Sequence, residues 1–154
     1  MIKPTIATTV MKNLLKLEEL AQFLACSITM ALIDAPWWTF VLLLIGPDIG
    51  MLGYMVSARM GALTYNILHH KALAVLVGLL VPYLALEFGP EDGGLDDHRF
   101  ELIIAGLILY GHASLDRIFG YGLKFGDNFH HTHLGWIGKG KVASGESKIG
   151  QRPS

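Results

Sequence analysis

The chain has 154 residues, of which 52% are hydrophobic and 16% charged, and its formal net charge is −1 at neutral pH. This length normally makes one domain, and a net charge near zero argues against a nucleic-acid partner. Charged residues stand at the ends and between apolar runs rather than along every helix face, so the composition favours a protein whose partner is the lipid bilayer. The single cysteine, Cys26, excludes an intramolecular disulfide and is interpreted as a small buried hydrophobe.

The first helix is predicted from Val10 to Ile33, after a flexible head of residues 1–9. Its opening, MKNLLKLEEL, is amphipathic, and only a helix that includes this opening reaches the ~20 residues that a membrane span needs. Glu18 and Glu19 stand at the head of the apolar run, and no clean cleavage pattern follows it. We therefore expect this helix to stay in the mature protein as the first span.

The second helix is predicted from Trp37 to Ala58, after a tight break at residues 34–36. Its paired tryptophans suit an anchor at the membrane interface. Inside it, the motif GPDIG contains a proline that predicts a kink and an acidic residue, Asp48, in an otherwise lipophilic span. The two glycines of this motif allow a close helix contact, either within the chain or between copies in a homo-oligomer.

After a short turn at residues 59–61, the third helix is predicted over residues 62–86. Tyr65 and His69 are four residues apart and therefore share one helical face. The next stretch, EFGPEDGGLDDHR, is acidic and rich in glycine, which is typical of a loop. Its carboxylates lack the spacing of a calcium-binding loop, so we interpret it as a solvated connection.

The fourth helix is predicted from Arg99 to Ile118, and His112 and Asp116 share one of its faces because they are four residues apart. A cytoplasmic segment, residues 121–138, follows it. That segment holds three histidines: His130, His131 and His133. The remaining residues, 139–154, contain almost no apolar side chains and are predicted to be disordered.

Lysine and arginine residues precede the first helix, follow the fourth and occupy the second loop, whereas the loop before the fourth helix is acidic. The positive-inside rule then places both termini in the cytoplasm and predicts an all-α, four-span membrane bundle over residues 10–138. A rise of ~1.5 Å per residue puts Asp48 roughly 15 Å deep, His69 roughly 12 Å and His112 roughly 10 Å, with Asp116 nearer the surface. Together with the carboxylates of the first helix, these groups are expected in one layer of the cytoplasmic half.

Two imidazoles and two carboxylates in one layer suit a divalent metal ion, and zinc, iron and manganese are the candidates. Ionisable groups at membrane depth are costly and usually serve a function, and helical bundles build metal sites from such inward-facing side chains. The predicted ligands are Asp48, His69, His112, Asp116 and His133. We expect His133, with His130 or His131, to close over the layer from the cytoplasmic side.

Four stretches carry a resemblance to a known family: KLEEL, APWWTFVLLLIGPDIGMLGY, GALTYNILHH and GHASLDRIFGYGLKFGDNFHHTHLG. Together they cover the chain from about Leu14 to Gly138, and the chain resembles the bacterial integral-membrane family called domain of unknown function 4260. The resemblance implies a small, four-helix, multi-pass protein of the bacterial inner membrane, without an assigned activity. Relatives tend to have lysine and aspartate before THLG, where this chain has His130 and His131, so Thr132 and His133 are the matching positions.

Three functions are compatible with these residues. The first is metal-dependent hydrolysis of a lipid-soluble substrate, because a bound metal can activate water or polarise a carbonyl or phosphoryl oxygen. The layout is also distantly similar to inner-membrane proteins labelled metal-dependent hydrolases. The second function is a non-enzymatic carrier or proton relay, and the third is a structural or interaction protein whose polar residues, with Arg117, only lock the helices together.

Overall fold

The computed structural model describes residues 6–88 and 96–137. The tail predicted to be disordered, residues 139–154, lies outside the described residues, as do residues 89–95 of the acidic loop. Of the head predicted over residues 1–9, only residues 6–9 are described, and these residues are helical. The first helix therefore begins earlier than the predicted Val10.

The described chain is mostly helical, and several helices are short because the second and third predicted helices are each divided. In chain order the helical elements are α1 (Ile6–Leu32), α2 (Trp37–Ile45), the 3₁₀ helix η1 (Gly46–Met55), α3 (Ala58–Leu68), α4 (Lys71–Val75), the π-helical segment η2 (Leu76–Leu80), α5 (Val81–Phe88) and α6 (Asp96–Phe119). Two short strands follow, β1 (His131–Thr132) and β2 (Gly135–Trp136).

The turn between the second and third predicted helices lies earlier than expected. The Ser57 hydroxyl accepts a hydrogen bond from the Met60 N–H at 3.1 Å and thereby caps the start of α3. Residues 59–61, which were predicted as the turn, consequently lie inside α3. The tight break predicted at residues 34–36 is confirmed, since it separates α1 from α2.

Two further interruptions bend the helices that follow α2. Pro47 stands at the start of η1, where its missing N–H ends the α-helical pattern of α2, as the predicted kink required. The third predicted helix is not continuous, because α3 ends at Leu68 and α4 begins at Lys71. His69 and His70 occupy this break, so one of the predicted metal ligands lies at a bend rather than on a straight helix.

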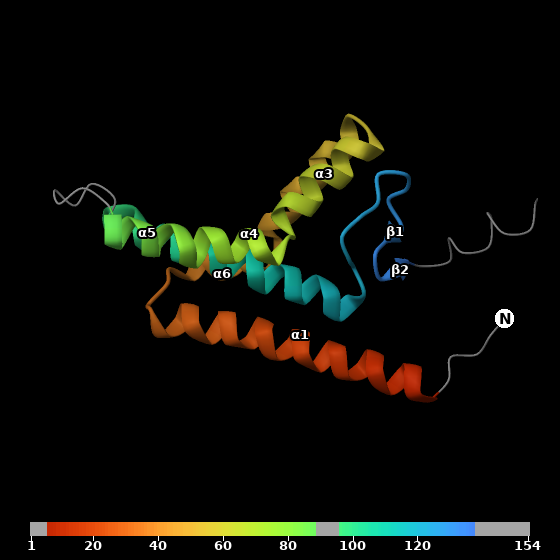
Figure 1. The fold of residues 1–154 in the computed structure, drawn as a ribbon, viewed down its shortest axis with the longest axis horizontal. Coiled ribbons are helices and arrows are strands. Elements are labelled where there is room, and N and C mark those ends of the chain that lie inside the picture. The colour runs from red at the N-terminus through yellow and green to blue at the C-terminus, as the bar shows by residue number, and fades with distance from the viewer. Residues whose placement is uncertain (1–5, 89–95, 138–154) are drawn as a thin grey trace, which may run out of the picture.

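α6 lies at the centre of the described fold. Figure 1 shows α1 running alongside α6, with α4 and α5 lying along another side of it. η1 and α3 form a helical hairpin that leaves this bundle at an angle. A core of four buried side chains joins α1, α2 and α6: Met30, Leu43, Ile104 and Ile108.

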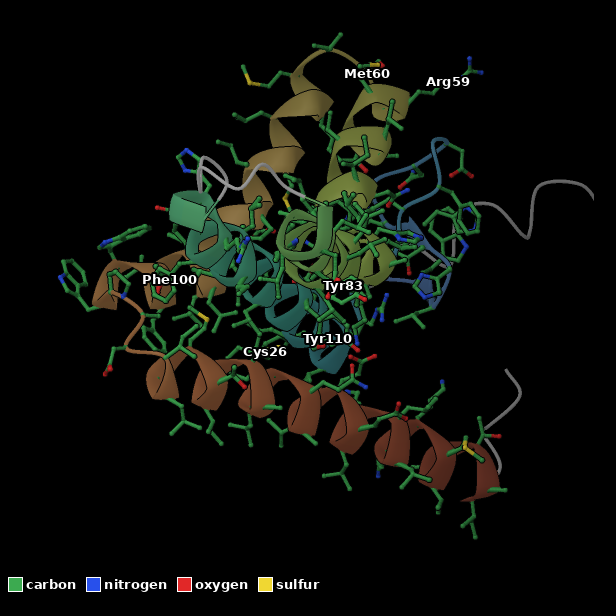
Figure 2. All side chains as sticks on the ribbon, turned by 60° about the vertical axis from the view of Figure 1, so that its left-hand side comes forward. Cys26, Arg59, Met60, Tyr83, Phe100 and Tyr110 are labelled. Carbon is green, nitrogen blue, oxygen red and sulfur yellow. The ribbon has the colours of Figure 1, made fainter. Side chains whose placement is uncertain are left out.

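Small residues allow two of these close contacts. A Cβ on Gly50 would lie 2.9 Å from the Thr64 carbonyl oxygen, so this glycine of GPDIG serves a helix contact within the chain. A Cβ on Gly111 would lie 3.1 Å from the Cβ of Cys26. Cys26 is buried on the face of α1 that looks toward α6 (Figure 2), which confirms its interpretation as a small buried hydrophobe.

Two of the described helices are long and apolar enough to cross a membrane, Trp37–Met55 and His98–Phe119. A third span is present if Ala58–Leu68 and Lys71–Glu87 are counted together across their 42° bend. α1 is long enough but is not among these candidates, because charged residues interrupt its apolar sequence. The described structure thus has two to three candidate spans packed together, where four were predicted.

The segment after α6 is not helical, so the all-α prediction holds only for the bundle. β1 and β2 pair antiparallel, with His131 opposite Trp136 and Thr132 opposite Gly135. Gly135 has a φ of 112°, in the left-handed region that favours glycine. The Thr132 hydroxyl donates to the Gly135 carbonyl at 2.8 Å, so the THLG stretch forms the turn of a small hairpin.

Candidate metal centre

Four of the five predicted ligands meet at one place in the fold. Asp48 lies on η1, His69 directly follows α3, and His112 and Asp116 lie on α6. Each offers one ligand atom, and these atoms all lie within 4.8 Å of one another. The expected convergence of these four side chains on one place is thereby confirmed, and their common depth in a membrane stays a prediction.

The bends in the second and third predicted helices bring these side chains to α6. Pro47 turns the chain out of α2 immediately before Asp48. α3 runs back along η1 and stops at the break that contains His69. The centre therefore lies where the η1–α3 hairpin leaves the bundle, against the last turns of α6.

Both histidine rings are held by backbone carbonyl groups. His112 Nδ1 lies 3.0 Å from the Leu43 carbonyl oxygen, and His69 Nδ1 lies 2.8 Å from the Tyr65 carbonyl oxygen. A carbonyl oxygen only accepts, so each Nδ1 carries the hydrogen that it donates. In the neutral ring this leaves the Nε2 lone pair available, which is how metal-binding histidines are commonly oriented.

The two Nε2 atoms face the two carboxylates at distances longer than direct hydrogen bonds. His69 Nε2 lies 3.3 Å from Asp116 Oδ2 and 3.7 Å from Asp48 Oδ1. His112 Nε2 lies 3.5 Å from Asp48 Oδ1 and 3.9 Å from Asp116 Oδ1. Tetrahedral zinc with bonds of ~2.0–2.1 Å separates its ligand atoms by roughly 3.3 Å. The histidine–carboxylate distances of 3.3–3.9 Å are equal to this separation or somewhat longer.

Three of these ligand atoms are buried without a hydrogen bond. Asp48 Oδ1, His69 Nε2 and His112 Nε2 have no hydrogen-bond partner among the residues that the structure describes. A buried polar atom without a partner normally costs free energy comparable to a lost hydrogen bond. All three atoms are electron-pair donors that face one another, so a shared cation would satisfy them together.

Tyr65 orients the fourth ligand. Its hydroxyl donates a hydrogen bond to Asp116 Oδ2, and its ring stacks on His69 with the ring centroids 3.7 Å apart. One residue thus positions two ligands that come from different helices. The sequence placed Tyr65 on the face of His69 by its spacing, but nothing in the sequence indicated that its hydroxyl reaches α6.

Lys124 is a second residue beside the four candidate ligands. The sequence indicated its charge but not its burial. Its side chain is 3% exposed, its ammonium donates to the Phe129 carbonyl at 3.1 Å, and its backbone N–H and C=O both bond the Asn66 side chain. Burial lowers the pKa of the Lys124 ammonium, and the nearby carboxylates of Asp116 and Asp48 oppose this shift. A lysine assigned to a cytoplasmic loop by its charge is therefore a buried cation beside the centre.

The three histidines of the hairpin segment lie outside this group. His133 Nδ1 accepts the Leu123 N–H at 2.8 Å, and the structure does not bring its side chain into the cluster of four. His131 contacts Asp127 at 2.8 Å, a contact that holds the pKa of the Asp127 carboxyl below its ordinary range, and it stacks on Trp136. His130 is exposed and packs edge-on against Phe129.

The carboxylates of α1 belong to a different polar cluster. Glu19 forms ion pairs with Lys71 and with Arg117, the latter at 3.5 Å. Glu18 is exposed on the same helix and accepts a hydrogen bond from Gln22 at 3.2 Å. The polar side chains that were expected in one layer therefore form two clusters. One contains the four candidate ligands, and the other contains the ion pairs of Glu19.

The centre differs in accessibility from one ligand to the next. The side chains of His69 and His112 are 3% and 1% exposed, whereas that of Asp48 is 40% exposed. Asp48 is thus the most exposed of the four residues.

The family model described as "Domain of unknown function (DUF4260)" matches residues 12–137. This range includes all four converging side chains and the hairpin, and it confirms the resemblance seen in the sequence motifs. Searches among curated proteins and among solved structures gave no match.

Proposed function

Because the chain belongs to the DUF4260 family, whose description names no activity, its function has to be inferred from the site, and we propose a membrane metalloprotein. Asp48, His69, His112 and Asp116 bind one divalent ion, for which zinc, iron and manganese are the candidates. The observation that carries the proposal is the set of three buried ligand atoms that lie close together without a hydrogen bond to any described residue.

The same observation argues against a purely structural role. Side chains that only lock helices together would satisfy one another, as Glu19 and Lys71 do through a direct ion pair and hydrogen bond. In the candidate centre the Nε2 atoms are instead held 3.3–3.9 Å from the carboxylates. Such spacing leaves room for an ion between them.

We further propose that the protein crosses the bacterial inner membrane four times, with both termini in the cytoplasm. α1 would be the fourth span, although its charged residues keep it from being recognised as a span by composition. The Glu19 carboxylate costs little if it stays paired with Lys71 and Arg117 inside the bundle. The outward-facing residues of α1, including Leu17, Leu24 and Ile28, are large, apolar and exposed, as a lipid-facing surface requires.

Metal-dependent hydrolysis of a lipid-soluble substrate is the activity that we propose for this centre. A bound divalent ion supplies an activated water or polarises a carbonyl or phosphoryl oxygen. The exposure of Asp48 would give a reactant access, and the buried Lys124 ammonium adds positive charge that would stabilise a developing oxyanion.

The test is the metal content of the full chain purified in detergent, measured by inductively coupled plasma mass spectrometry. Wild type should carry close to one ion per chain, and His69→Ala should lose it. His70→Ala is the matched control, because His70 is the neighbouring histidine but is exposed and outside the cluster. Asp48→Asn removes a ligand charge while keeping the shape of the side chain.

Equal metal loss in the two histidine variants would contradict the proposed centre, as would a wild type that takes up none of the three metals. The protein would then be better explained as a proton relay or a locked structural bundle. If metal is bound, long-chain carboxylic esters and phosphoesters in mixed micelles test the hydrolase. A metal-loaded chain that cleaves neither would favour the carrier.

A further inference from the structure

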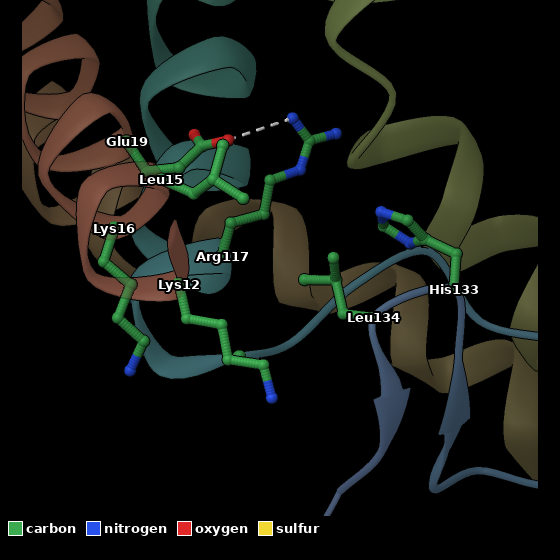
Figure 3. Close-up of a pocket in the computed structure, with 8 residues that line it drawn as sticks. Lys12, Leu15, Lys16, Glu19, Arg117, His133 and Leu134 are labelled. Atoms are coloured by element: carbon green, nitrogen blue, oxygen red, sulfur yellow. Dashed lines mark hydrogen bonds and ion pairs between the residues drawn. The ribbon is translucent and has the colours of Figure 1, made fainter. Parts of the chain in front are cut away.

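A second site lies outside the candidate metal centre. A pocket of about 550 Å³ opens between the first half of α1, the end of α6 and the hairpin segment. Its lining residues are Lys12, Leu15, Lys16, Glu19, Arg117, Gly120, His133 and Leu134. None of the four converging metal ligands is among them. Figure 3 shows α1 on one side of this pocket and His133 on the other, with Arg117 and Leu134 between them.

The charges of this pocket favour an anion. Two lysines and one arginine line it, together with a single carboxylate, that of Glu19. This carboxylate is already paired with Lys71, and it reaches only one Arg117 nitrogen, Nη1, at 3.5 Å. An arginine presents five donors in a fixed fork that matches phosphate or carboxylate oxygens, so Arg117 retains donors for a ligand.

The turn after α6 forms part of the pocket next to Arg117. Gly120 ends α6 with a φ of 88°, and the chain turns there through hydrogen bonds from Gly120 N–H to Arg117 C=O and from Tyr121 N–H to Asp116 C=O. The next glycine, Gly122, lies under the imidazole of His133, since a Cβ there would come within 2.6 Å of Nδ1. This turn places the hairpin against the end of α6 and closes one wall of the pocket.

The ligand has an apolar part as well as a charged one. Leu15 and Leu134 line the pocket beside the cations and are both more than half exposed. The amphipathic opening of α1 that carries Lys12 and Lys16 has the composition of an interfacial helix segment. Basic side chains at such a level attract the anionic lipids of the cytoplasmic leaflet.

We propose that this pocket binds the phosphate group of an anionic phospholipid, with Arg117, Lys12 and Lys16 on the oxyanion and Leu15 and Leu134 against the acyl chains. Phosphate is the shared chemistry of lipid headgroups and of free phosphate ions. The apolar wall is what assigns the ligand to the lipid.

The experiment is native mass spectrometry of the full chain in detergent with three probes. Phosphatidylglycerol supplies a net anionic lipid, phosphatidylcholine a zwitterionic lipid, and inorganic phosphate the anion without acyl chains. Lys12→Gln and Lys16→Gln each remove one exposed cation from the pocket. Arg59→Gln is the matched control, because Arg59 is an exposed cation at the tip of the η1–α3 hairpin (Figure 2).

Wild type should retain phosphatidylglycerol in preference to phosphatidylcholine, and each lysine variant should bind it about five-fold more weakly, as expected for one interfacial cation. The Arg59→Gln variant should bind as wild type does. Equal retention of the two lipids, or an equal loss in Arg59→Gln, would overturn the site. Full displacement of the lipid by inorganic phosphate would overturn its assignment to a lipid. Metal content, measured on the same samples, separates this outcome from a failure of the metal centre.

Discussion

Pro47 and His112 are coupled through a single carbonyl group. In a continuous α-helix the N–H of residue 47 would bond the carbonyl of residue 43, but proline has no N–H. The Leu43 carbonyl instead lies 3.0 Å from His112 Nδ1, on α6. Pro47, which ends α2, thus leaves the Leu43 carbonyl free to accept a hydrogen bond from His112 Nδ1. This bond orients the His112 ring so that its Nε2 points toward the centre.

This coupling predicts that Pro47→Ala weakens metal binding without weakening the fold. Alanine restores an N–H that competes for the Leu43 carbonyl, so His112 loses the partner that fixes its ring. Loss of such a supporting contact typically costs ~10–100-fold in metal affinity. The measurement is a titration against a fluorescent chelator, with the melting temperature recorded in parallel.

Pro82→Ala is the matched control for this variant, because Pro82 lies in α5, outside the cluster. An equal loss of affinity in both proline variants would show that helix flexibility, rather than the Leu43 carbonyl, governs the centre.

Tyr65→Phe should lower metal affinity by a similar ~10–100-fold, because it removes only the hydroxyl that holds Asp116. The aromatic ring remains to stack on His69, so the melting temperature of the metal-free protein should change little. Tyr54→Phe is the control, since the buried Tyr54 hydroxyl has no hydrogen-bond partner among the described residues. Unchanged affinity in Tyr65→Phe would remove Asp116 from the ligand set.

Much of the candidate centre could be predicted from the sequence, for a specific physical reason. Ionisable side chains are rare in apolar helices, so Asp48, His69, His112 and Asp116 were conspicuous, and the rise per residue gave their common level. The roles of the Leu43 carbonyl and of the Tyr65 hydroxyl could not be predicted in this way. They depend on how neighbouring helices are rotated, which periodicity alone does not give.

The errors in the predicted fold have a similar origin. Arg59 and Gly61 were expected in a turn, whereas the side-chain cap of Ser57 sets the start of α3 at Ala58, four residues before the predicted start at residue 62. Lys124 was counted among the cytoplasmic charges that follow the fourth helix, because a sequence shows the charge of a residue but not its burial. The pattern of ionisable residues therefore identified the four converging side chains correctly, but it did not show which other charged residues near them are buried.

Removing the metal should destabilise the protein. A ligand that binds only the folded state at a concentration about 100 times its Kd stabilises that state by about 2.7 kcal/mol. A chelator should therefore lower the melting temperature of wild type and leave that of His69→Ala unchanged. Metal release should also occur on acidification, because the imidazole and carboxylate ligands must be deprotonated to bind. A wild type that melts at the same temperature with and without chelator would contradict this coupling.

Glu19→Gln should be strongly destabilising. It removes the carboxylate that pairs with Lys71 and Arg117 and leaves two largely buried cations, a loss of about 3 kcal/mol. Glu18→Gln, one residue away on an exposed position, should stay within about 0.5 kcal/mol of wild type. Adding Lys71→Met to Glu19→Gln should recover part of the loss, because it removes one unpaired charge. Equal effects of the two glutamate variants in a denaturant titration would show that the cluster contributes nothing to stability.

The contact between η2 and α6 depends on Gly106. A Cβ at this position would lie 2.3 Å from the Cα of Gly78, so neither backbone can move aside without separating the two helices. Gly106→Ala should therefore cost about 1–3 kcal/mol, the usual range for overpacking, and should lower the melting temperature in detergent. Gly46→Ala is the matched control, since the atoms nearest to its Cβ would belong to the Leu42 side chain, at 3.2 Å or more. If both alanine variants melt together with wild type, the two helices are not packed through these glycines.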